Sequence, residues 1–333
     1  MPIRRVGHTA EVTTAGTAFH PELARIGRFI PRKLVTKANL VLLQRMSMLM
    51  ERRVPDGVLP LTLTTGVRVR LYRPRESTAS SPAQLWIHGG GYVIGSAAQD
   101  DASCRRFADA LGATVVSVNY RLAPQHPYPA GLEDCYAALT WLAGLPGVDA
   151  ERIAIGGASA GGGLAAALAL LARDRGEVHP AGQLLVYPML DDRSVGICRD
   201  DPGHRLWTHE SNRFGWSAYL GTADPEVAVP ARRKDLSGLP PAWIGVGTLD
   251  LFHDEDLDYA RRLRAAGVAC EVTVVDGAFH GFDGVAPKST VAQAFHRKQR
   301  DWLHDVFTNS APVRTIRAGA ENGAVDQPAM NSE

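Results

Sequence analysis

The chain has 333 residues, of which 45% are hydrophobic and 21% are charged, and its formal net charge is +1. This composition is typical of a globular protein with enough apolar residues for a large core. A net charge so close to zero does not draw the whole chain to nucleic acid or to an anionic membrane, so neither is an expected partner. The four cysteines, Cys104, Cys135, Cys198 and Cys270, form no C-x-x-C pair. Their scatter argues against a disulfide scaffold and a metal cage, and it favours buried thiols in a reducing compartment.

The amino-terminal part has no continuous apolar stretch after Arg4 and Arg5 that could serve as the core of a signal peptide. The apolar-rich segment 40–50 carries Gln44 and Arg45 and is too short to span a bilayer. The sequence therefore predicts a cytoplasmic protein without stable membrane insertion.

Apolar strand-like runs alternate with helical stretches along most of the chain. Alternation in 61–64 and 67–72 around a turn at Thr65-Gly66 predicts an antiparallel hairpin. Further strands are predicted at 83–87, 114–118, 152–156, 182–187, 242–246 and 271–275, and helices at 98–111, 132–142, 160–173 and 254–266. This rhythm predicts an α/β protein with a mostly parallel sheet and helices on both faces.

Two regions fall outside this rhythm. The segment 191–239 contains aromatic residues such as Trp207 and Trp216 but no clear strand. The segment 21–54 is predicted to be helical and amphipathic, with an apolar face formed by Leu40, Leu43, Met46, Leu49 and Met50. We expect both regions to cap the mouth of a site at the sheet edge. The alternative is that the amino-terminal helices pack on the side of the core or form a dimer contact.

These patterns divide the chain into five parts. Residues 1–55 are the amino-terminal helical cap segment, 56–190 the first part of the α/β core, 191–239 the cap insert, and 240–308 the second part of the core. Residues 309–333 lack periodicity and are predicted to be a disordered tail.

Two glycine-rich motifs, each placed after a predicted strand, carry the chemistry. The first is His88-Gly89-Gly90-Gly91, and the second is Gly157-Ala158-Ser159-Ala160-Gly161. The second has the form of a nucleophile elbow, in which a serine on a tight strand-to-helix turn exposes its hydroxyl. The first is a glycine strip whose backbone N–H groups can face a developing oxyanion. Together they predict an acyl-transfer enzyme.

A serine hydroxyl needs a general base, and that base needs an orienting acid. The loops after the strands at 242–246 and 271–275 supply Asp250 as the candidate acid and His280 as the candidate base, in the chain order that the elbow motif predicts. The alternatives are other histidines and other acids nearby. His88 is expected to brace the glycine strip, and His253 to lie at the surface or in the cap. Asp254, Glu255 and Asp256 open a helix, where they are expected to complement its dipole.

The start of the helix after Ser159 offers a further donor. The Ala160 N–H is unpaired within that helix, so it can join the N–H groups of Gly89 and Gly90 in an oxyanion hole. Three glycines follow at 161–163 and would weaken an ordinary helix. They indicate close packing of this helix against neighbouring backbone and room for an acyl group.

The motifs together resemble those of the hormone-sensitive-lipase-like carboxylesterases, over about residues 61–307. Other shared features are Asn119-Tyr120-Arg121-Leu122-Ala123-Pro124, the Tyr187-Pro188 pair, Gly238-Leu239-Pro240-Pro241-Ala242 and the Asp254-Glu255 pair. The resemblance implies an α/β-hydrolase fold, with a mostly parallel eight-stranded sheet, helices on both faces and a helical cap. It implies a Ser-Asp-His triad, ester substrates of short to medium acyl length and no cofactor. Some members dimerise through the last strand, so a homodimer stays open.

Two positions depart from the family pattern. Ala158 precedes the nucleophile where members commonly carry Asp or Thr, which removes a polar contact behind the elbow. Gln125 replaces the usual Glu, which puts an ion pair in doubt, although Glu133 and Asp134 lie nearby in sequence.

The function expected from the sequence is that of a serine carboxylesterase acting on a small-molecule ester. Three alternatives stay open. An amidase or deacetylase would use the same triad, and a lipase would use the 40–50 helix as a mobile lid. The third alternative is a small-molecule receptor whose catalytic site has decayed.

Overall fold

The computed structural model describes residues 18–75, 80–196 and 201–309. Its sheet has eight strands in the order β1-β2-β4-β3-β5-β6-β7-β8; β2 pairs antiparallel with β1 and β4, and the other pairs are parallel. The strands are β1 (Val58–Thr62), β2 (Arg68–Tyr72), β3 (Ser81–Ile87), β4 (Thr114–Asn119), β5 (Val148–Ala158), β6 (Gly182–Val186), β7 (Ala242–Leu249) and β8 (Cys270–Phe279). The predicted α/β class and mostly parallel sheet are confirmed.

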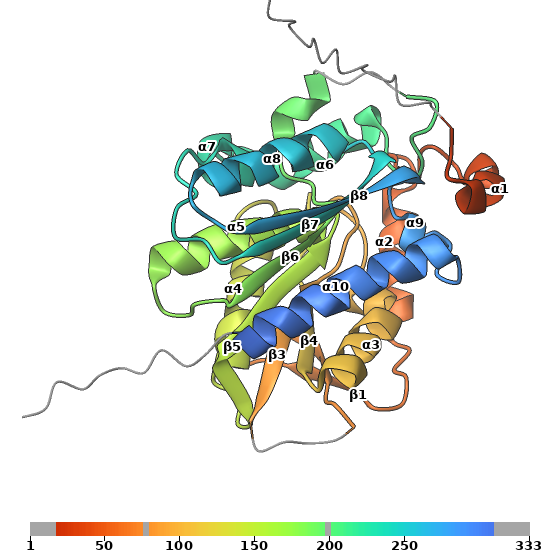
Figure 1. Ribbon diagram of the computed structural model, residues 1–333. Coiled ribbons are helices and arrows are strands. Elements are labelled where there is room, and N and C mark those ends of the chain that lie inside the picture. Colours follow the sequence, from red (N-terminus) through yellow and green to blue (C-terminus); the bar gives the residue numbers. More distant parts are fainter. Residues whose placement is uncertain (1–17, 76–79, 197–200, 310–333) are drawn as a thin grey trace, which may run out of the picture.

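Helices cover both faces of the sheet (Figure 1). Helices α3 and α10 pack on one face, and α4, α5 and α8 on the other, so the core is split into two hydrophobic clusters. The α-helices are α1 (Pro21–Phe29), α2 (Leu40–Glu51), α3 (Asp101–Leu111), α4 (Ala130–Ala143), α5 (Ala160–Arg175), α6 (His209–Leu220), α7 (Pro225–Ala228), α8 (His253–Ala265), α9 (Phe282–Val285) and α10 (Thr290–Asn309). The 3₁₀ helices are η1 (Ala97–Asp100), η2 (Asp192–Gly196) and η3 (Pro230–Arg232).

Most predicted elements lie within a few residues of the observed ones. The predicted hairpin forms, with Thr62 opposite Arg68. The predicted helix 98–111 begins as η1 and continues as α3, and β8 runs four residues past its predicted end to Phe279. Residues beyond 309, where a disordered tail was predicted, lie outside the described residues, as does Cys198. The other three cysteines are buried free thiols, as expected.

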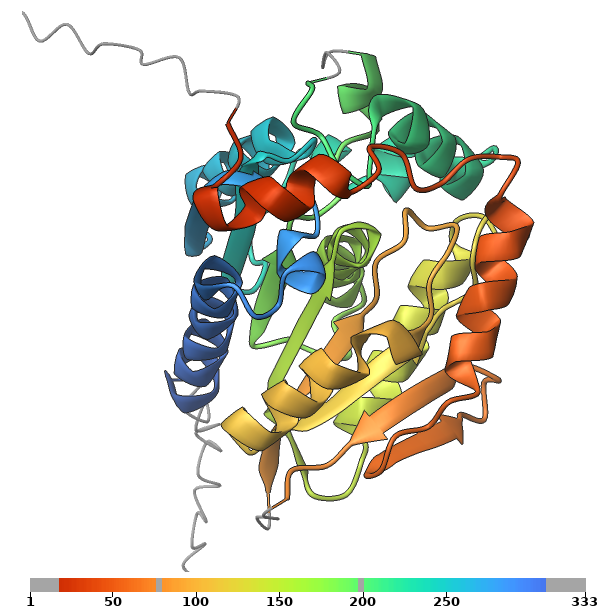
Figure 2. The same cartoon turned by 90° about the vertical axis from the view of Figure 1, so that its right-hand side faces the viewer.

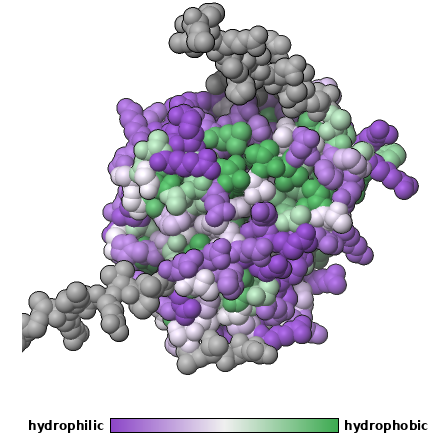
Figure 3. Space-filling model, viewed as in Figure 1, coloured by the Kyte–Doolittle hydropathy of each residue, from purple (hydrophilic) through white to green (hydrophobic). Residues whose placement is uncertain are grey.

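Strand β8 forms one edge of the sheet, and hydrophobic side chains gather over it in the surface view (Figure 3). Val274 on this strand is 43% exposed. The homodimer considered from the sequence stays a prediction. Within the described ranges, no helix combines the length and the apolar run needed to cross a bilayer.

The apolar face predicted for the amino-terminal helices turns inward only in part. Leu40 is buried and Leu43 is half-buried, but Met46, Leu49 and Met50 are each more than half exposed. Only the Leu40 and Leu43 part of this face therefore packs against the core, and the cap role of the segment stays a prediction. Helix α2 stands at the periphery beside the β1–β2 hairpin (Figure 2), and residues 30–39 separate it from α1.

Helix α5 begins in close contact with neighbouring backbone, as its glycines indicated. A Cβ atom on Gly161 would overlap the carbonyl oxygen of Ile87, at the end of β3. One on Gly163 would overlap the carbonyl oxygen of Met189. Positions 161 and 163 in the first turn of α5 can therefore hold only glycine this close to the sheet edge, a constraint that outweighs the low helix propensity of glycine.

The first turn of α8 carries three acids, but only one behaves as the sequence predicted. Asp254 is exposed at the helix start. Glu255 is buried and accepts hydrogen bonds from the N–H groups of Leu190 (2.8 Å) and Asp191 (3.2 Å), although burial raises the pKa of its carboxyl to about 8. Asp256 is fully buried, and neither of its carboxyl oxygens has a hydrogen-bond partner in the described part of the chain. Burial raises its pKa well above the ordinary value.

The contact between Gly161 and β3 predicts that one methyl group added at this position destabilises the protein. Gly161→Ala should lower the free energy of unfolding by about 1–3 kcal/mol or more, because the backbone of β3 must shift to admit the Cβ atom. Urea unfolding followed by circular dichroism measures this loss. Gly284→Ala is the matched control, since a Cβ atom there meets nothing within 4 Å. Equal stability of the two variants would contradict the packing argument.

The buried Asp256 should make the free energy of unfolding depend on pH. Because its pKa is higher in the folded than in the unfolded chain, the folded protein holds a proton that the unfolded chain releases. Its contribution to the free energy of unfolding therefore falls by about 1.4 kcal/mol per pH unit above the unfolded pKa, until the folded pKa is reached. Asp256→Asn lacks this proton and should gain stability relative to the wild type as the pH rises. Denaturation curves of the variant and the wild type at several pH values test this, and a stability difference that stays constant with pH would contradict it.

Candidate active site

Ser159 lies at the turn between β5 and α5 in a strained backbone conformation, with φ 58° and ψ −122°. Non-glycine residues rarely adopt a positive φ, so the surrounding contacts must hold it. The Ser159 N–H donates to the carbonyl of Val186 (2.9 Å), and its own carbonyl accepts from Gly163 and Met189 (both 3.0 Å). This is the geometry of a nucleophile elbow.

His280 and Asp250 meet Ser159 at the carboxyl edge of the sheet. Asp250 follows β7 directly and His280 follows β8, and these strands run parallel to β5. The His280 Nε2 atom lies 2.9 Å from the Ser159 Oγ, and its Nδ1 lies 2.8 Å from Asp250 Oδ2. Because an ionised carboxylate only accepts, Nδ1 carries the proton and Nε2 is left to accept from the serine hydroxyl. The three residues predicted from the sequence are therefore hydrogen-bonded in one line.

Two aromatic rings hold the imidazole of His280. The ring of Tyr187 meets it edge-on at 4.8 Å between centroids, and that of Phe252 does so at 5.2 Å. The Tyr187 hydroxyl donates to Asp283 Oδ1 (2.8 Å), whose other oxygen binds His296 Nε2 (3.0 Å). The sequence did not identify these contacts, and its only signal was the Tyr187-Pro188 pair.

The alternative histidines serve other contacts. The Nδ1 atom of buried His88 lies 2.8 Å from the Gly89 carbonyl oxygen, and its ring stacks on Tyr120 at 4.3 Å. Burial lowers the pKa of His88 to about 4, so its imidazole is neutral at physiological pH. His253 begins α8 and pairs with Asp254 (2.8 Å). Neither is hydrogen-bonded to Ser159 among the described residues.

The glycine strip lies beside the nucleophile. A Cβ atom built on Gly89 would stand 3.3 Å from the Cβ of Ser159. Gly90 has φ +126°, which only glycine adopts readily. Within the described ranges, the N–H groups of Gly89, Gly90 and Ala160 donate to no protein acceptor. Three backbone donors near one hydroxyl are thus left available for a ligand oxygen.

Residues from both predicted cap segments cover this edge. The Leu206 N–H donates to Pro31 (3.0 Å), and its carbonyl accepts from Leu34 (3.2 Å), which joins the two segments. The buried indole of Trp207 packs on Gly91 so closely that a Cβ atom there would overlap it. This contact explains the third glycine of the strip, and sequence patterns did not reveal it.

Helix α2 approaches the loop that follows the glycine strip with its polar side. Gln44 Nε2 donates to the Val93 carbonyl (2.8 Å), and Ser47 Oγ accepts from the Gly95 N–H (3.2 Å). One turn further on, Glu51 accepts from the N–H of Ala98 (3.3 Å). These three residues are spaced along one face of the helix, so they fasten α2 to the loop.

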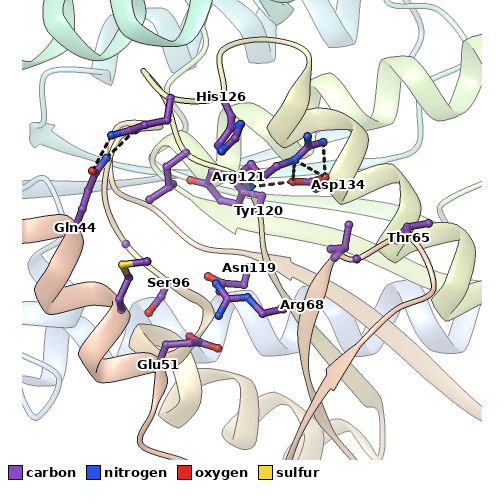
Figure 4. A pocket seen from close by; sticks show the side chains of 16 residues that line it. Gln44, Glu51, Thr65, Arg68, Ser96, Asn119, Tyr120, Arg121, His126 and Asp134 are labelled. Carbon is purple, nitrogen blue, oxygen red and sulfur yellow. Dashed lines mark hydrogen bonds and ion pairs between the residues drawn. The ribbon is translucent and has the colours of Figure 1, made fainter. Parts of the chain in front are cut away.

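The two departures from the family pattern have visible consequences. Gln125 pairs with Gln44 through two amide hydrogen bonds (3.1 and 3.2 Å), in place of an ion pair at this position. Asp134 instead binds Arg121, as Figure 4 shows in a cavity of about 550 Å³ next to α2. Ala158 lines another cavity, of about 590 Å³, behind the elbow. Among the described residues, no cluster of three or more His, Cys, Asp or Glu side chains could hold a metal ion.

Comparison with known proteins shows the family to which the chain belongs. A family model described as the alpha/beta hydrolase fold matches residues 84–284. The esterase LipI of Mycobacterium tuberculosis is 39% identical over 240 residues, which is 68% of this chain and 75% of the relative. The ethyl acetate hydrolase of Pseudomonas putida is 36% identical over 245 residues, covering 68% of this chain and 76% of that protein.

Solved structures agree with this fold. The crystal structure of esterase LipW from Mycobacterium marinum has a TM-score of 0.78 and 35% identity, and the match covers 87% of this chain and 96% of that one. A bacterial heroin esterase has the same TM-score at 36% identity, with 87% and 98% covered. With these relatives and the matching family model, the chain belongs to the hormone-sensitive-lipase-like carboxylesterases of the α/β-hydrolase fold, a family of carboxylic ester hydrolases.

Proposed function

We propose that this protein is a serine carboxylesterase that works through Ser159, His280 and Asp250. The observation that carries the proposal is the hydrogen-bonded line from Ser159 Oγ through the imidazole to the carboxylate, at 2.9 and 2.8 Å. A neutral Nε2 aimed at a serine hydroxyl can take its proton as the oxygen attacks a carbonyl carbon. Asp250 then stabilises the imidazolium that forms.

The tetrahedral intermediate places negative charge on the former carbonyl oxygen. The N–H groups of Gly89, Gly90 and Ala160 are the donors proposed to bind it, since each lies near Ser159 and has no protein acceptor among the described residues. His280 then donates its proton to the leaving alcohol, which departs and leaves an acyl-enzyme on Ser159. Water attacks that ester by the same route, the carboxylic acid leaves, and the serine is restored.

The substrate class proposed is esters of short to medium acyl length. Ser159 is only 7% exposed, and Trp207 and Leu206 pack over the loops that carry the triad and the glycine strip. Such a covered nucleophile favours acyl groups that fit within a confined space. The name of the P. putida relative, ethyl acetate hydrolase, agrees with a small ester.

An amide substrate is the second candidate, because one relative points to it. The arylacetamide deacetylase of Oryctolagus cuniculus is 31% identical over 299 residues, covering 68% of this chain and 75% of that protein. The same triad can cleave an amide when His280 protonates the departing nitrogen. The ratio of kcat/KM for a matched p-nitrophenyl ester and p-nitroanilide decides between the two.

Removing the nucleophile should abolish turnover without disturbing the fold. Ser159→Ala is expected to lower kcat on p-nitrophenyl acetate by about 10⁴-fold or more, because the residual site lacks covalent catalysis. An organophosphonate should add one adduct to the wild type, seen by intact-protein mass spectrometry, and none to the variant. Exposed Ser237→Ala is the control and should match the wild type. An adduct on Ser159→Ala would contradict the assignment.

The covered site also predicts a limit on acyl length. Initial rates on p-nitrophenyl esters of increasing chain length should peak at short to medium chains and decline for long ones. The decline should appear in kcat/KM below the solubility limit of each ester, since it reflects exclusion from the pocket. A rate that keeps rising to the longest acyl chain would contradict a confined acyl site.

A further inference from the structure

Helix α2 exposes most of its apolar side chains, unlike a normal surface helix, and only Leu40 and Leu43 pack against the core. Its inward face presents Gln44, Ser47 and Glu51 to the loop behind the glycine strip. Its other side carries large apolar side chains that are each 52–65% exposed: Val41, Leu42, Met46, Met48, Leu49 and Met50. A helix in a globular protein ordinarily buries such a face. A contiguous exposed apolar face of this kind marks an interaction surface.

The charge around this face is strongly one-sided. The segment 31–54 contains six basic residues and a single acid, whereas the whole chain has a net charge of only +1. That acid, Glu51, points inward to the Ala98 N–H and the buried Arg70. Arg45, exposed on α2, and Arg52, just after its end, have no side-chain hydrogen bond or ion pair within the described residues. The apolar face is therefore accompanied by unpaired positive charge.

A second basic feature lies at the amino-terminal end of the helix. A cavity of about 530 Å³ is lined by Lys33, Lys37 and Arg213 and by one acid, Glu210, together with apolar and hydroxyl side chains. Lys33 forms an ion pair with Glu210, but the side chains of Lys37 and Arg213 have no such partner in the described part of the chain. This cavity can accept an anionic group of the size of a phosphate.

We propose that α2 is a docking helix for the surface of an anionic lipid bilayer. Its exposed face enters the boundary between headgroups and acyl chains, while the arginines and the Lys37–Arg213 cavity contact the anionic headgroups. A helix that presents a large apolar face with basic residues beside it can lie in the interface plane, where buried apolar area and attraction to anionic lipids set the binding strength. This binding goes beyond the proposed hydrolysis and does not depend on it.

The same observations disfavour a second copy of the chain as the partner that covers the exposed face of α2. A twofold contact brings the same patch of both subunits together, so the unpaired arginines of both copies would gather at one contact. Like charges at such a contact oppose association. An anionic lipid surface would bury the apolar face and pair its basic side chains with anionic headgroups.

Vesicle co-sedimentation of the full chain tests the proposal. Vesicles of phosphatidylcholine alone are compared with vesicles of equimolar phosphatidylcholine and phosphatidylglycerol, at low and at high salt. The protein should bind the anionic vesicles and bind the neutral ones much less, and added salt should weaken the binding. Arg45→Gln/Arg52→Gln should lower the partition coefficient on anionic vesicles by more than tenfold, since each basic residue contributes about fivefold.

The apolar contribution is tested with a second pair of variants. Leu42→Ser/Leu49→Ser removes two side chains from the exposed face and should abolish vesicle binding. Val227→Ser, which alters an exposed valine on α7, is the matched control and should bind like the wild type. All variants should keep the far-ultraviolet circular dichroism of the wild type. They should also hydrolyse soluble p-nitrophenyl acetate at the rate of the wild type. The test of lipid binding is then independent of the test of esterase activity.

Three outcomes would overturn the proposal. The first is equal binding of the wild type to neutral and anionic vesicles, and the second is binding that Leu42→Ser/Leu49→Ser leaves intact. The third is a dimer in light scattering that dissociates in Leu42→Ser/Leu49→Ser, because the face would then be an interface between copies of the chain.

Discussion

The close approach of three backbone segments at the end of β5 is the constraint on which the site depends. The β5 strand ends at the elbow, α5 begins there, and the end of β3 lies against both. A Cβ atom on Gly157 would overlap the carbonyl oxygen of Gly161, and one on Gly161 would overlap that of Ile87. Only glycine permits this packing, which holds Ser159 at a positive φ and sets the glycine strip beside it.

The parallel sheet brings the other two residues of the candidate triad to Ser159. Because β5, β7 and β8 run in the same direction, the residues that follow them meet at one edge. Asp250 and His280 therefore need only short loops to reach Ser159. The rings of Tyr187 and Phe252 then limit the orientation of the imidazole, and the Tyr187 hydroxyl is itself fixed by Asp283. A general base gains its efficiency from such preorganisation, because its rotamer is set before the substrate arrives.

Helix α2 meets the core through the apolar side chains of Leu40 and Leu43 and through polar contacts along the same side. Gln44 and Ser47 hydrogen-bond to the loop after the glycine strip, so the helix braces the segment that carries the proposed oxyanion donors. A helix fastened in this way leaves most of its apolar side chains outward. The proposed lipid-docking surface and the support of the loop are thus two consequences of the orientation of α2.

The sequence by itself determined the sheet, the order of its strands along the chain and the residues of the candidate triad. Strand periodicity is local, and the elbow and glycine strip are short motifs whose backbone geometry permits few other residues. The glycines at the start of α5 also indicated close packing against neighbouring backbone, because glycine weakens an ordinary helix.

The tertiary structure decided what depends on neighbours distant in the chain. The direction of the apolar face of α2 could not be predicted, because periodicity shows that a helix has two faces but not which one meets the core. Glu255 and Asp256 looked like helix-start acids, yet α8 packs so that both are buried. Trp207 on Gly91 and Tyr187 on His280 are contacts between separate loops with no local signal. Such contacts arise only when the elements are packed, because burial and partner choice are properties of the assembled core.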